Sequence, residues 1–147
     1  MESMCRVGSA WALAVVVAAL AVLLVAGDLL SASPVVIAAQ LLALAVAVWA
    51  RRSFPPGTFG VTAEPRGQAV IEAGPYRWIR HPQYAAALLL IWAGVLSHLS
   101  ARSLVVGGVV VVVAGVRIAC EERRLRAVLP GYDAYARRTR RLIPFVL

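Results

Sequence analysis

Residues 7–27 read VGSAWALAVVVAALAVLLVAG, a stretch of 21 residues without a charge between Arg6 and Asp28. As a helix rising 1.5 Å per residue, it would be about 30 Å long, enough to cross the hydrocarbon core of a bilayer. Its length and the lack of apolar–polar alternation favour a membrane helix over a strand, despite the many valines. A cleavable signal peptide is disfavoured, because the stretch is too long for the apolar part of one and only Arg6 precedes it as a basic residue.

Three more apolar stretches follow along the chain. The second begins with Ser33 as N-cap and Pro34 as first helical residue, and ends before Arg51 and Arg52. The fourth contains Arg117, which can remain near the membrane boundary by extending its long side chain towards water. We predict an all-α integral membrane protein that forms a single domain over 1–147. It should have a central cytosolic loop and a C-terminal interfacial helix. The chain should cross the membrane about four times, with transmembrane helices at about 7–27, 34–50, 82–101 and 103–120.

Composition agrees with a membrane protein. The 147-residue chain is 61% hydrophobic and only 15% charged, whereas soluble domains are about a quarter charged. The net charge is +8, and all fifteen basic residues are arginines. In so apolar a chain the expected counterparts of this charge are lipid headgroups rather than nucleic acid. The expected partners are membrane lipids and a lipophilic small molecule, with no obligate protein partner.

The arginines also predict the orientation. Fourteen of the fifteen lie in the N-terminus, the central loop or the C-terminal segment, and Arg102 is the exception. The positive-inside rule therefore places both termini and the central loop in the cytosol. In the C-terminal segment four apolar side chains are spaced as one edge beside arginines, typical of a helix lying on an anionic leaflet; they are Tyr132, Tyr135, Leu142 and Ile143.

Two motifs lie at the predicted cytosolic boundary. The first motif, residues 74–84, reads GPYRWIRHPQY and leads into the third apolar stretch. The second motif, residues 117–125, reads RIACEERRL and follows the fourth. Each has a purely structural interpretation: His81 and Pro82 can cap a helix, Tyr84 can lie in an interfacial aromatic belt, and Arg117 can pair with Glu121 one turn later.

Taken together, the two motifs are more specific. Their order and spacing, followed by PGYxxY and a closing Ile-Pro, resemble the isoprenylcysteine carboxyl methyltransferase family over residues 69–145. The resemblance implies an integral membrane methyltransferase that uses S-adenosyl-L-methionine, with Arg117 as the catalytic, substrate-binding residue. The residues that it assigns to the methyl donor are Gln68, Ala69, Val70, Ile71, Tyr76, His81, Pro82, Gln83, Tyr84 and Glu121.

The chemistry of these residues suits that reaction. Aromatic side chains can hold the adenine and the sulfonium, and a carboxylate such as Glu121 can accept from ribose hydroxyls or an ammonium group. The sulfonium is already activated, so the protein mainly aligns the reactants, and no metal is expected. We predict methyl transfer to a carboxyl or hydroxyl oxygen of a membrane-resident lipid, such as an isoprenylcysteine-like acid or a phenolic polyketide. Two alternatives are a dinucleotide-dependent membrane reductase, which shares a similar His-Pro-x-Tyr turn, and a non-enzymatic four-helix membrane protein.

Overall fold

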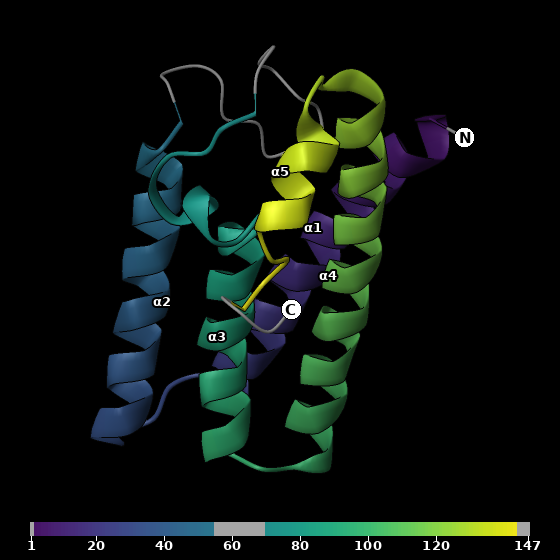
Figure 1. Ribbon diagram of the computed structural model, residues 1–147. Helices are drawn as coiled ribbons and strands as arrows, with labels where there is room; N and C mark the ends of the chain where they lie inside the picture. The colour runs from purple at the N-terminus through teal and green to yellow at the C-terminus, as the bar shows by residue number, and fades with distance from the viewer. Residues whose placement is uncertain (1, 55–69, 144–147) are drawn as a thin grey trace.

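The computed structural model, which describes residues 2–54 and 70–143, confirms the all-α prediction (Figure 1). Its elements are α1 (Glu2–Val25), α2 (Pro34–Arg52), the short 3-10 helix η1 (Gly74–Arg77), α3 (Pro82–Ser97), α4 (Ala101–Val128) and α5 (Tyr132–Arg138).

The four long helices pack side by side. Helix α2 packs against α3, and α4 packs against both α3 and α1. The α1–α2 connection and the α3–α4 turn lie at one end of the bundle, the lower end in Figure 1, and we call this the turn end. Elements η1 and α5 lie at the other end, beside the last turns of α2 and α4, and we call this the motif end. Both motifs therefore meet at one end of the molecule.

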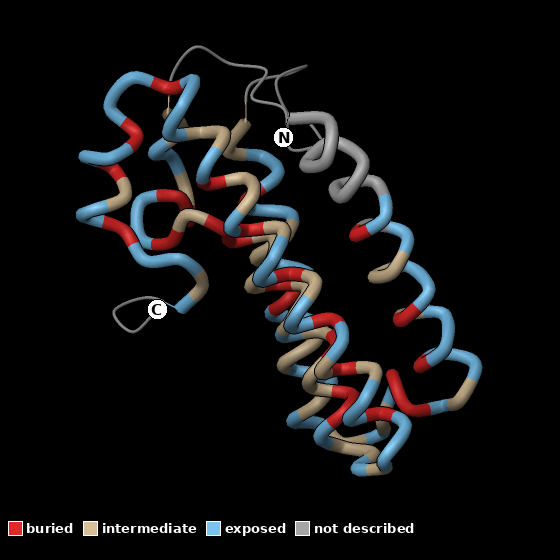
Figure 2. Tube along the Cα trace, turned by 90° about the vertical axis from the view of Figure 1, so that its right-hand side faces the viewer, coloured by how far each residue is buried: buried red, intermediate tan, exposed pale blue. Residues whose placement is uncertain are grey.

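The main hydrophobic core joins α1 to α3 and α4. It includes Leu23 of α1, Ile91 and Val95 of α3, and Val110 of α4, all of them almost completely buried. Figure 2 shows that α1 converges with the other helices towards the turn end. The core therefore holds the turn end most tightly.

The turn end is also held by close polar contacts. Gly94 of α3 lies so near the α1–α2 connection that an added Cβ would be 2.5 Å from the carbonyl oxygen of Leu29. The side chain of Gln40 donates a hydrogen bond to the same oxygen at 2.7 Å. Arg102 pairs with Asp28 at 2.8 Å, so the single arginine outside the predicted cytosolic segments ties the two turns together.

Two helices of the described residues are long and apolar enough to cross a membrane, α2 and α4. The apolar segment 14–25 of α1 and the 16-residue α3 are shorter than that. Apolar side chains cover the outer face of α2, where Leu41 is 61% exposed and Leu44 57% exposed. An apolar face of this kind is suited to contact with lipid tails.

The helix boundaries correct two expectations. The third stretch was expected to be helical over 82–101, but α3 ends at Ser97. Helix α4 starts at Ala101, because Ser100 and Ser103 form a capping box in which each side chain bonds the other residue's backbone N–H. It then continues to Val128, beyond the expected end at 120, so one helix carries the entire second motif.

The C-terminal segment corrects a third expectation. Helix α5 has only seven residues, and its tyrosines do not form an outer apolar edge. Tyr132 and Tyr135 are each 3% exposed and pack with Leu129 against Leu125 and Val70. The reason is a chain reversal after α4 at Gly131, whose φ of +83° is in the left-handed region that favours glycine. The interpretation of these two tyrosines as lipid-facing residues is therefore wrong.

Candidate active site

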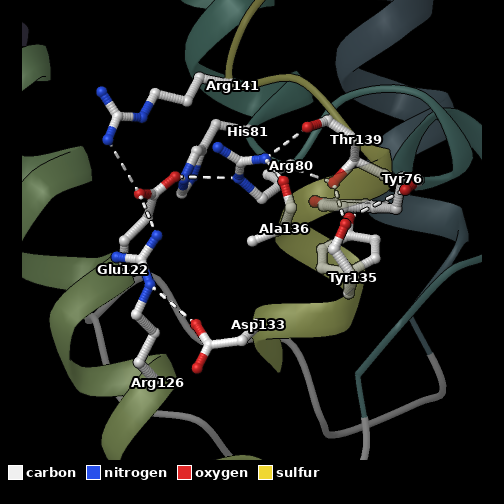
Figure 3. Close-up of polar contacts among 10 residues, drawn as sticks. All are labelled: Tyr76, Arg80, His81, Glu122, Arg126, Asp133, Tyr135, Ala136, Thr139 and Arg141. Carbon is white, nitrogen blue, oxygen red and sulfur yellow. Dashed lines mark hydrogen bonds and ion pairs between the residues drawn. The ribbon is translucent and has the colours of Figure 1, made fainter. Parts of the chain in front are cut away.

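The most buried charge of the motif end is the carboxylate of Glu122, in the second motif (Figure 3). Its Oε1 accepts a hydrogen bond from Arg80 Nε at 2.9 Å and lies 3.4 Å from His81 Nε2. Its Oε2 accepts from Arg126 at 3.2 Å and from Arg141 at 3.3 Å. The side chain of Glu122 is 1% exposed, so this carboxylate is desolvated and its charge is compensated from several sides.

Arg80 connects this carboxylate to the C-terminal segment. Its Nη1 donates to the carbonyl oxygen of Ala136 at 2.7 Å and to the carbonyl oxygen of Thr139. The Arg80 side chain is only 9% exposed, so its hydrogen bonds are made with protein groups rather than with water. One guanidinium thus joins the start of α3, the last turns of α4 and the chain after α5.

The backbone reinforces the same junction. The N–H of Arg140 donates to the carbonyl of Trp78 at 2.9 Å, and the N–H of Arg80 donates to the carbonyl of Arg140 at 2.7 Å. The N–H of His81 donates to the carbonyl of Arg141 at 3.0 Å. The C-terminal segment therefore holds the first motif in place immediately before α3.

A second polar group contains four of the eleven residues expected to bind the two substrates. Tyr84, on the first turn of α3, donates its hydroxyl hydrogen to Glu121 Oε2 at 2.8 Å. The guanidinium carbon of Arg117 lies 5.8 Å from the centre of the Tyr84 ring, a cation–π arrangement. Burial, and next the negative charge of Glu121, raises the pKa of the Tyr76 phenol well above its usual value. The structure thus brings Tyr84, Arg117 and Glu121 together, with Tyr76 within electrostatic range of Glu121.

The remaining residues of the His-Pro-x-Tyr run have structural contacts. Pro82 is the first residue of α3 and is completely buried, as its capping position predicts. The side-chain amide of Gln83 donates to the carbonyl oxygen of Ala47 at 3.0 Å and joins α3 to α2. The ring of His81 lies between Glu122 and the edge of Tyr84, whose ring centre is 5.6 Å away. Of these three residues, His81 is the one next to the polar group around Glu121.

The stretch before the glycine is described only in part. Gln68 and Ala69 lie outside the described residues. Val70 packs against the cluster of Leu129, Tyr132 and Tyr135, and Ile71 is half-buried.

Two aromatic contacts close this region from the side of α2. The ring of Phe54 lies edge-on to Tyr76 with centres 5.2 Å apart. Trp49 lies edge-on to Trp78 at 5.9 Å. An added Cβ on Gly74 would be 3.1 Å from the indole nitrogen of Trp49, closer than an ordinary van der Waals contact. The close approach of η1 to α2 therefore requires a residue without a side chain at position 74.

The pairing of Arg80 with Glu122 was not predicted from the sequence. Arg80 belongs to the first motif and Glu122 to the second, but no functional role was predicted for either residue. The adjacency of Glu121 and Glu122 was a signal for this pairing. Consecutive side chains on a helix point about 100° apart, so the two carboxylates must have different partners.

A comparison with known protein families matches the isoprenylcysteine carboxyl methyltransferase (ICMT) family over residues 29–127. The matched region extends from the α1–α2 connection almost to the end of α4, and it includes both motifs. Comparisons with curated proteins and with solved structures gave no match. Because the matched residues make up about two thirds of the chain, and because they include both motifs with Glu121 and Glu122, the chain belongs to the ICMT family, a family of methyltransferases.

Proposed function

We propose that this protein transfers a methyl group from S-adenosyl-L-methionine to a carboxyl or hydroxyl oxygen of a lipophilic substrate that enters from the membrane. The main support is the contrast between the two adjacent carboxylates of α4. Glu122 is surrounded by three arginines and His81, whereas the group around Glu121 contains the uncharged hydroxyl of Tyr84 and a single arginine, Arg117. Glu121 is therefore the carboxylate suited to a cationic ligand.

The residues around Glu121 fit the groups of the methyl donor. Tyr76 and Tyr84 offer aromatic faces to the adenine and the sulfonium. Glu121 can accept hydrogen bonds from the ammonium group or the ribose hydroxyls. When bound, the donor supplies a methyl group on positively charged sulfur; the carbon–sulfur bond breaks as the carbon–oxygen bond forms, and neutral S-adenosylhomocysteine leaves.

Arg117 is the proposed contact of the acceptor. It lies one helical turn nearer the middle of α4 than Glu121. In the membrane arrangement proposed below, a lipid head would arrive from that side. Its guanidinium can hold a carboxylate through two parallel hydrogen bonds. A carboxylate acceptor is already ionised at pH 7 and needs no base, whereas a phenol needs a nearby cation to lower its pKa. Arg117 can serve either acceptor by aligning the oxygen with the methyl group.

The proposed membrane arrangement has four crossings with the motif end in the cytosol. It is supported by the distribution of the arginines and by the apolar surfaces of α2 and α4. Helices α1 and α3 complete the four crossings, with both termini in the cytosol. A water-soluble donor then reaches Glu121 from the cytosol, and a lipid reaches Arg117 from the bilayer.

The direct test is binding of S-adenosylmethionine to the detergent-purified protein by titration calorimetry, with NADPH as the competing cofactor class. We expect micromolar binding of the first and none of the second. Glu121→Gln should weaken donor binding at least tenfold, about 1.4 kcal/mol, because it removes a charged acceptor. Glu72→Gln is the matched control, since this carboxylate is 45% exposed and pairs with Arg138. Binding of NADPH alone would support the reductase, and binding of neither would support a non-enzymatic membrane protein.

The acceptor can be identified in cells. Lipid mass spectrometry of cells that overproduce the protein and are fed methyl-labelled methionine should show one labelled lipid species. That species should be missing when the Glu121→Gln variant is produced.

A further inference from the structure

Helix α5 carries two tyrosines that are equally buried but differ in their hydrogen bonds. Tyr132 and Tyr135 are each 3% exposed, and their ring centres are 5.8 Å apart. The hydroxyl of Tyr135 donates to the carbonyl oxygen of Tyr76 at 2.8 Å. The buried hydroxyl oxygen of Tyr132 has no hydrogen-bond partner within the described part of the chain.

A buried hydroxyl without a partner is costly. It has lost its hydrogen bonds to water, and phenylalanine would fill the same volume without that loss. Native proteins satisfy nearly all such groups, so an unsatisfied one points to a bound molecule. Burial, and next the charge of Glu122, raises the pKa of Tyr132 to about 12, so the phenol is protonated at pH 7 and can donate a hydrogen bond.

The surroundings of Tyr132 indicate the ligand group. The guanidinium of Arg126 lies 5.8 Å from the ring centre, and Arg80 also acts on the phenol electrostatically. Arg80, Arg126 and Arg141 converge on Glu122, and Asp133 pairs with Arg126. Three arginines thus pair with two carboxylates, so an anionic ligand group beside Tyr132 would have cationic neighbours.

Glu121 adds the complementary charge. It directly precedes Glu122 in α4 and accepts a hydrogen bond from Tyr84, so its carboxylate lies on the neighbouring face of the same helical turn. A ligand with an ammonium group beside a carboxylate would match this pair, with the ammonium at Glu121 and the carboxylate at Tyr132. The amino-acid end of the methyl donor has both groups.

We propose that Tyr132 is a further donor-binding residue, whose hydroxyl donates a hydrogen bond to the carboxylate of the donor's amino-acid end. This inference rests on the proposed function. It assigns a ligand-binding role to α5, which lies beyond residues 29–127 of the family match.

The test compares Tyr132→Phe with Tyr135→Phe in the full-length protein. Both changes keep the ring and remove one hydroxyl group. Affinity for S-adenosylhomocysteine, the unreactive product, is measured by calorimetry, and stability without ligand by thermal unfolding. We expect Tyr132→Phe to weaken binding at least tenfold and to leave the unfolding temperature unchanged or higher. Tyr135→Phe should lower the unfolding temperature, because it leaves the Tyr76 carbonyl without its partner.

A second ligand tests the carboxylate. Decarboxylated S-adenosylmethionine keeps the ammonium group but lacks the carboxylate. The wild-type protein should bind it at least tenfold more weakly than it binds S-adenosylmethionine, whereas Tyr132→Phe should bind the two compounds about equally.

Three results separate the possible failures. If Tyr132→Phe binds S-adenosylhomocysteine within twofold of wild type, Tyr132 is not a donor-binding residue. If the variant still discriminates against the decarboxylated compound as strongly as wild type does, the carboxylate is bound elsewhere and the inference is overturned. If the wild-type protein binds none of these compounds, the proposed function itself fails.

Discussion

Replacing Glu122 by glutamine should destabilise the protein through the arginine that it leaves behind. The change keeps the size of the side chain but removes the negative charge from a position that is 1% exposed. Arg126 and Arg141 are 39% and 59% exposed, so they can recover hydration. Arg80 is 9% exposed and cannot do so without separating α3, α4 and the C-terminal segment.

The size of the effect follows from this difference in exposure. Breaking a buried ion pair by removing one partner costs about 3–5 kcal/mol. The lower end applies here, because the amide oxygen of glutamine still accepts a hydrogen bond and Arg80 keeps its bonds to two carbonyl groups. For a chain of this size, about 3 kcal/mol corresponds to a decrease of about 6–12 °C in the unfolding temperature.

The assay is thermal unfolding of the detergent-purified protein, followed by circular dichroism without ligand. Glu72→Gln is the control: it removes an exposed charge from the same end of the molecule and should cost less than about 1 kcal/mol. Replacing both Glu122 and Arg80 by apolar residues should recover stability relative to Glu122→Gln, because no unpaired charge stays buried. If Glu122→Gln and Glu72→Gln shift the unfolding temperature equally, the buried ion pair does not hold the motif end together.

Three further predictions concern other parts of the chain. Arg117→Ala and Arg117→Lys should both lower kcat/KM for the lipid at least a hundredfold, about 2.7 kcal/mol, while donor affinity stays within a few-fold of wild type. Lysine keeps the charge but lacks the planar guanidinium that forms two parallel hydrogen bonds, so normal activity of Arg117→Lys would contradict the acceptor role. Topology reporters fused after Arg52 and after Leu147 should lie in the cytosol, and a reporter inserted in the α1–α2 connection should lie outside the cell. An external location of the reporter after Leu147 would rule out the four-crossing arrangement. Gly94→Ala should lower the unfolding temperature, because its Cβ would clash with a backbone carbonyl, whereas Gly108→Ala, with open space around it, should not; equal stability of both would refute the close approach.

Local sequence signals predicted the starts of α2 and α3. Ser33-Pro34 and His81-Pro82 mark the first residues of α2 and α3, since proline fits the first helical turn. The ends were less predictable. Arg117 and the charges after it suggested that α4 would stop near 120, but charged residues continue a helix readily once it leaves an apolar environment.

The site could be predicted only as far as its residues belong to motifs. The meeting of Tyr84 with Glu121 follows from two helices packed side by side. The meeting of Arg80 with Glu122 also requires the C-terminal segment to fold back, and this depends on the left-handed turn at Gly131. Periodicity alone assigned the wrong environment to Tyr132, because an apolar edge faces lipid or protein equally well until its neighbours are known.

The pairing of the first motif with the C-terminal segment has a consequence for biosynthesis. The carbonyl of Arg140 accepts a hydrogen bond from the backbone N–H of Arg80, and Arg140 is translated 60 residues after Arg80. At about 5–20 residues per second, the ribosome needs about 3–12 s to supply those residues. During that interval α3 and α4 can enter the membrane, while the first motif still lacks the segment that orders it. If the proposed function holds, a nascent chain cannot use methyl donor until Arg140 and Arg141 have been added and the first motif is held in place.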